Sequence, residues 1–183
     1  MSDTTVRRYP LSLRILHWTR AALILGLIAL GTIMTRMPED ATITYTTFYP
    51  NHKQFGVLVF FLAVVHLLIR SRSALPALPP GLSRWEVLLS RLVHKAMMVL
   101  VIVVPLMGYA MSSSFTQSDG VPFFFFEMPE LLPKNDKAFE LFDTLHSWLA
   151  YTLLGLIMLH VAGVLKHRFL DKGGDTDVLP RML

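Results

Sequence analysis

The chain has 183 residues, of which 53% are hydrophobic and 16% charged, whereas a soluble domain carries about 25% charged residues. Its charges gather between long apolar runs, which argues against a soluble core and indicates a multi-spanning membrane protein. There is no cysteine, so disulfides, thiolate metal sites and covalently attached c-type haem are excluded. No motif typical of nucleic-acid binding is present.

Four apolar segments follow one another along the chain: residues 16–34, 52–69, 93–111 and 145–165. Each approaches the ~20 residues needed to cross a ~30 Å hydrocarbon core. Arginines precede the first segment as in a signal peptide, but no small-residue cleavage site follows it, so we expect it to be retained. No strand pattern competes with this interpretation. The sequence therefore predicts an all-α, four-helix transmembrane bundle that forms a single domain over residues 1–183.

Lysine and arginine are distributed unevenly among the connections. Four of the seventeen lie in the first and third connections, namely Arg36, Lys53, Lys134 and Lys137. The other thirteen lie near the N-terminus, in the second linker and in the tail: Arg7, Arg8, Arg14, Arg20, Arg70, Arg72, Arg84, Arg91, Lys95, Lys166, Arg168, Lys172 and Arg181. The positive-inside rule then predicts that both termini are cytoplasmic.

The fourth segment contains two histidines, His146 and His160, that are fourteen residues apart. Fourteen residues are nearly four helical turns, so both rings lie on one face about 21 Å apart along the axis. The second segment repeats this spacing with His52 and His66. By the predicted topology, His52 and His146 lie near the outer surface, and His66 and His160 near the inner one.

The first and third segments combine one histidine with one glycine at the same spacing. His17 is followed by Gly31, and His94 by Gly108, with each glycine at the outer level. A glycine lets a large flat group approach the backbone. Two planar cofactors, one in each leaflet, would need this layout, and haem b with two histidine ligands fits it.

At the outer level only His52 and His146 are available as a ligand pair. At the inner level four candidates compete on spacing alone: His17, His66, His94 and His160. The alternative is a haem-free transporter with a histidine-lined path. Such paths commonly use Asp or Glu, and Glu86 is the sole acid near the inner end of a segment.

Other residues allow two interpretations. Arg14, Arg20, Arg70 and Lys95 near the inner level could pair with haem propionates or serve only as positive-inside anchors. His167 in the basic tail is expected to be solvated. The run Phe123–Phe126 in the long loop is expected to lie on the bilayer surface or to cap the outer cofactor.

Four stretches resemble the bacterial cytochrome b-561 family, which is related to the cytochrome b subunits of Ni/Fe-hydrogenase and formate dehydrogenase. They are RILHWTRAALI, NHKQFGVLVF, LVHKAMMVLVIVVPLMGY and LHSWLAYTLLGLIMLHVAGVLKHRFLDKGGDTDVLPRML. The resemblance implies a four-helix cytochrome of the bacterial inner membrane with two non-covalent b haems that exchange electrons with quinone.

The resemblance also implies a ligand set. The outer haem would take His52 and His146, and the inner haem His17 and His160. His94 would lie near a quinone or a propionate. His66 departs from the family pattern, and its pairing with His160 stays open as the competitor. Besides a quinone-linked oxidoreductase, for which part of the family suggests superoxide oxidation, a haem relay subunit of a separate oxidoreductase is an alternative.

Overall fold

The computed structural model describes residues 8–118, 120–171 and 176–183. Two of the cations used for the topology prediction, Arg7 and Lys172, lie outside the described residues. Four long helices dominate the fold, and each is long and apolar enough to cross a membrane. They are α1 (Leu11–Met34), α2 (Tyr49–Arg72), α3 (Arg84–Ser114) and α4 (Asp136–Phe169). The predicted all-α membrane bundle is confirmed.

The helices extend beyond the predicted apolar segments, most of all at the starts of α3 and α4. Helix α3 begins nine residues early because Ser83 and Glu86 form a reciprocal capping box around its first turn. Helix α4 also begins nine residues early, at a cap where the Asn135 side chain accepts from the backbone N–H groups of Lys137 and Ala138. Polar residues in their first turns extend both helices beyond the apolar segments that would cross the membrane.

The short elements lie in the connections. A π-helical turn, η1 (Thr44–Phe48), leads directly into α2, and a 3₁₀ turn, η2 (Leu179–Arg181), lies in the tail. The sequence shows no strand pattern, so the two short strands of the long loop were not predicted. Strands β1 (Val121–Phe123) and β2 (Phe126–Met128) pair antiparallel in the long loop. A run of consecutive aromatic residues lacks the alternation and the Asn-Gly or Gly turn that usually indicate a hairpin.

The bundle core is thin and lies at mid-height. It consists of one or two buried residues from each helix: Ile24, Val59, Ala63, Val101 and Leu153. Outside this layer many large apolar side chains are exposed, as expected for helices that face lipid. Helix α1 packs on α2, α2 on α3 and α3 on α4, whereas α1 and α4 make little direct contact.

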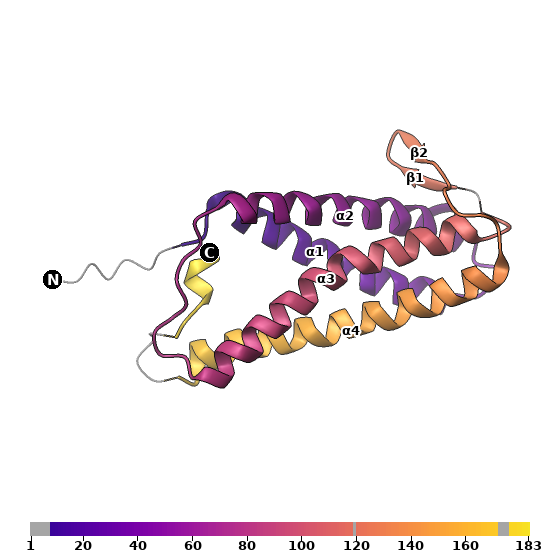
Figure 1. The fold of residues 1–183 in the computed structure, drawn as a ribbon. Coiled ribbons are helices and arrows are strands. Elements are labelled where there is room, and N and C mark those ends of the chain that lie inside the picture. Colours follow the sequence, from indigo (N-terminus) through magenta and orange to yellow (C-terminus); the bar gives the residue numbers. More distant parts are fainter. Residues whose placement is uncertain (1–7, 119, 172–175) are drawn as a thin grey trace.

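The two ends of the bundle differ in what closes them. The β1–β2 hairpin lies at one end, and the start of α1 and the C-terminal segment lie together at the other (Figure 1). The tail is fastened there by hydrogen bonds from the Tyr9 N–H to the Arg181 carbonyl and from Trp18 Nε1 to the Met182 carbonyl. We call the end with the tail the inner end and the end with the hairpin the outer end.

Candidate functional site

The outer histidines come from opposite sides of the bundle and face each other. His52 lies in the first turn of α2 and His146 lies in the outer part of α4. Their ring centroids are 6.0 Å apart and their planes are 81° apart. A metal holds an imidazole nitrogen at about 2.0–2.1 Å, so two imidazoles on opposite sides of one metal have ring centres about 6 Å apart. The pair therefore fits one metal ion between the two rings.

A backbone carbonyl fixes the orientation of the His146 ring. Its Nδ1 lies 2.9 Å from the carbonyl oxygen of Val104 in α3. A carbonyl can only accept, so Nδ1 carries the proton and donates, which leaves Nε2 of the neutral ring as a lone-pair donor to a metal. The sequence could not indicate this contact because it joins two helices. His52 differs, since its Nδ1 is buried and has no partner among the described residues.

Both outer imidazoles rest against a glycine of a neighbouring helix. A Cβ placed on Gly31 of α1 would lie 3.1 Å from Cε1 of His52. A Cβ placed on Gly108 of α3 would lie 2.9 Å from Cε1 of His146 and 3.0 Å from its Nδ1. The glycines were expected to admit a flat cofactor to the backbone. The structure adds that each glycine also makes room for an imidazole ring.

Three of the four inner candidates form a contiguous group of rings. The centroids of His17 and His160 are 6.4 Å apart, with planes at 64°. His94 lies closer to His160, at 4.9 Å, which is short for two ligands on opposite sides of one metal. Its Nδ1 lies 2.6 Å from the carbonyl oxygen of Ser90 and donates to it. The spacing of His17 and His160 is therefore the one that matches the outer pair.

His66 occupies a different position at this level. Its side chain is only 9% exposed, and its Nδ1 has no partner within the described part of the chain. It lies within electrostatic range of His17, Arg20 and Arg70. Among the described residues, the ring contacts of His160 are with His17 and His94, and His66 is not one of them.

The cations that could hold anionic groups near the inner pair are differently placed. Arg14 and Arg20 of α1 each have a buried Nε without a partner among the described residues, and Arg20 lies within electrostatic range of His17. Such orphaned guanidinium nitrogens fit carboxylate groups such as haem propionates. Lys95 is exposed and lines a shallow groove between α3 and α4. Arg14 and Arg20 are thus the better suited of these cations.

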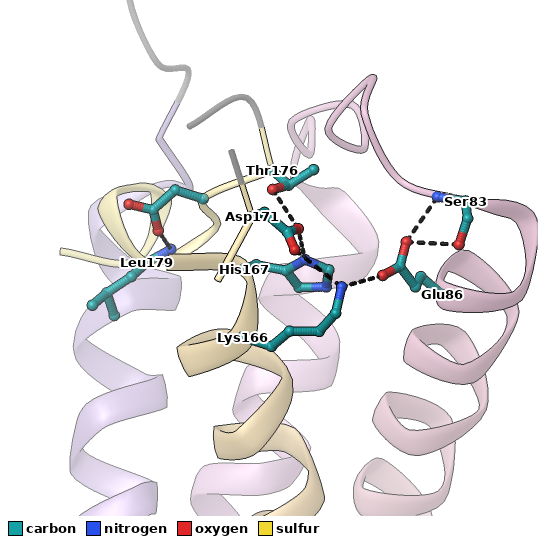
Figure 2. A network of polar contacts seen from close by, with 8 residues as sticks. Ser83, Glu86, Lys166, His167, Asp171, Thr176 and Leu179 are labelled. Carbon is teal, nitrogen blue, oxygen red and sulfur yellow. Dashed lines mark hydrogen bonds and ion pairs between the residues drawn. The ribbon is translucent and has the colours of Figure 1, made fainter. Parts of the chain in front are cut away.

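A polar network joins the tail to α3 and α4 at the inner end (Figure 2). Asp171 accepts from His167 at 2.7 Å, from the Thr176 hydroxyl at 2.8 Å and from Lys166 at 3.1 Å. These hydrogen bonds hold the pKa of the Asp171 carboxyl well below its usual range. Lys166 also pairs with Glu86. The expectation that His167 is solvated was wrong, because a carboxylate four residues on binds its ring.

The comparisons with known proteins identify a family for the chain. A family model described as prokaryotic cytochrome b561 matches residues 8–183. The chain is 31% identical to cytochrome b561 homolog 2 of Escherichia coli (strain K12) over 98% of this chain and 93% of that protein. It is 23% identical to cytochrome b561 homolog 1 of the same organism over 86% of this chain and 88% of the relative.

Proposed function

We propose that this chain holds two b haems and exchanges electrons with quinone. The premise is that it belongs to the prokaryotic cytochrome b561 family and is therefore a haem b electron-transfer protein of a bacterial membrane. The membership makes a haem-free transporter untenable. The observation that carries the proposal is the presence of two histidine pairs with ring centroids 6.0 and 6.4 Å apart. Both distances suit axial ligation of one metal by two imidazoles.

At the outer level we assign His52 and His146 as the axial ligands. His146 is held in the tautomer that presents Nε2, because its Nδ1–H donates to the Val104 carbonyl. His52 is positioned by burial and by its contact with Gly31. A haem held there would have one ligand with a hydrogen-bonded Nδ1 and one without.

At the inner level we assign His17 and His160 as ligands. Trp18 packs its ring edge-on to His17, with centroids 5.1 Å apart. Arg14 and Arg20 would neutralise the propionates. His94 would then serve a quinone or a propionate through Nε2, since its Nδ1 donates to Ser90. The contact of His94 with His160 places it next to the proposed ligand.

The two histidine pairs give electrons a route along the bundle axis. A haem held by each pair would supply one-electron chemistry through its ferric and ferrous states. The helices hold the ligands about 21 Å apart along α4, and the thin apolar core lies between the pairs. With both termini cytoplasmic, as the charge bias predicts, the route runs between the two faces of the inner membrane.

Haem quantitation tests the proposal. A pyridine haemochrome assay on the purified protein should give about two haems per chain, and a reduced quinone analogue should reduce both in the visible spectrum. The two-haem assignment is wrong if the fully loaded protein contains one haem. Two haems that a quinol cannot reduce would retain the ligand assignment and overturn the quinone partner.

A further inference from the structure

The β1–β2 hairpin turns at two phenylalanines, which is unusual for so tight a turn. Phe123 pairs with Phe126, so Phe124 and Phe125 form a two-residue connection. Phe124 has a φ of 52°, in the left-handed region that bulky residues rarely adopt. Two-residue hairpins favour glycine, asparagine or aspartate at such positions. An aromatic residue held in this conformation suggests a functional reason for its side chain.

The tip of the hairpin exposes its aromatic side chains. Phe124 is 47% exposed, Phe125 101% and Phe126 56%. The run Val121–Phe126 contains no charged residue. Contiguous exposed aromatic residues usually mark an interaction surface rather than a solvated loop.

The hairpin lies against the side of a membrane-spanning helix. Phe124 contacts Phe55 and Phe123 contacts Phe61, with ring centroids 5.7 Å apart in each case. Both partners belong to α2, and Phe61 is itself 42% exposed on the surface that faces lipid. The hairpin stands out beside α2 near the outer end of the bundle (Figure 1). Its tip therefore continues the lipid-facing surface of that helix.

The base of the hairpin is fastened to the bundle. Lys53 Nζ donates to the Gly120 carbonyl at 3.0 Å, and Val121 is only 2% exposed. On the other side, the Leu132 N–H donates to Oγ of Ser113, which is fully buried at the end of α3. The exposed phenylalanines are thus presented at a fixed height on α2.

We propose that the Phe123–Phe126 turn inserts into the bilayer at the boundary between headgroups and acyl chains. A bundle embedded through α2 brings the turn to this depth, since Phe124 packs on Phe55 in the second turn of that spanning helix. The Phe123 ring reaches further along the helix to Phe61. The turn's unpaired backbone groups can be solvated at the boundary but not in the hydrocarbon core, and aromatic rings favour this region. The proposal is independent of haem number and of the electron acceptor.

Site-directed labelling tests the insertion, because the chain has no cysteine. Phe125→Cys would be labelled with an environment-sensitive nitrobenzoxadiazole maleimide and reconstituted in phosphatidylcholine vesicles. The matched control is Gln117→Cys, an exposed polar position in the same loop. A wild-type visible spectrum would show that each variant is folded.

The label at Phe125 should emit at shorter wavelength than the label at Gln117. A nitroxide attached high on the acyl chain should quench it several-fold more strongly, and aqueous iodide several-fold less. Equal responses at the two positions would overturn the proposal. So would a signal at Phe125 that responds to the protein-to-lipid ratio and not to the nitroxide lipid, since that result would show contact with a second copy of the chain.

Discussion

Substitution of Gly108 by alanine should selectively weaken binding of the proposed outer haem. The new Cβ would lie 2.9 Å from Cε1 of His146 and 3.0 Å from its Nδ1, whereas carbon atoms in contact are normally about 3.5–4.0 Å apart. The ring would have to withdraw by about 0.6–1.1 Å, more than the ~0.5 Å within which a functional geometry must be held. The His146 ring cannot move away easily, because its Nδ1 is hydrogen-bonded to the carbonyl of Val104, which lies on α3 with Gly108.

The size of the effect follows from the cost of overpacking. Inserting a methyl group into a packed site destabilises it by about 1–3 kcal/mol, which is about a 5- to 150-fold loss of affinity for the outer haem. Helix propensity acts in the opposite direction, since alanine is favoured over glycine by up to about 1 kcal/mol. Fold stability should therefore change little while the haem site is damaged.

The assay combines haem quantitation with low-spin EPR, whose anisotropy depends on the angle between the two imidazole planes. Gly108→Ala should lose or shift the outer signal and keep the inner one. Gly26→Ala in α1 and Gly155→Ala in α4 are matched controls, because nothing lies within 4 Å of a Cβ at either position. Wild-type haem content and an unchanged EPR signal in Gly108→Ala would refute the argument.

The remaining predictions concern the ligands, the topology and the tail. His52→Ala should lose about half of the haem and keep the inner signal, and retention of both low-spin haems would contradict the outer pairing. His17→Ala should lose the inner haem while His66→Ala keeps it, as judged by reduced-minus-oxidised spectra, and the opposite result would transfer the role to His66. An alkaline phosphatase fused to the C-terminus should be inactive if both termini are cytoplasmic, and strong activity would reverse the orientation. Because the pKa of Asp171 is depressed in the folded protein, its network stabilises the fold above the unfolded pKa of about 3.9 and loses that contribution as the pH falls further. Thermal unfolding should therefore depend on pH less steeply below about pH 4 in Asp171→Asn than in the wild type, and parallel profiles would count against the network.

The spans and the outer histidine candidates could be read from the sequence because both depend on local spacing. Apolar segments of membrane length indicate helices without knowledge of their neighbours, and only two histidines lie at the outer level. The signal for the start of α3, the Ser83–Glu86 capping box, was also present in the sequence, although hydropathy alone places the helix start too late.

The unpredicted features depend on contacts between segments that are distant in the chain. The Val104 carbonyl reaches His146 from another helix, and the Phe124 turn is held by its packing on Phe55. Spacing puts His66 at the same depth as His17, and only the packing of the helices brings the His17 ring near His160. Depth along a span can be counted in residues, whereas proximity across the bundle cannot.

The position of α4 in the chain has a consequence for biogenesis. This helix is the last of the four to leave the ribosome, and it contributes one histidine to each proposed pair, His146 to one and His160 to the other. Neither pair can exist while the first three helices are being inserted. If these pairs hold the haems, cofactor loading follows membrane insertion of α4. The inner haem would then join the earliest and latest helices, α1 and α4, which otherwise touch little.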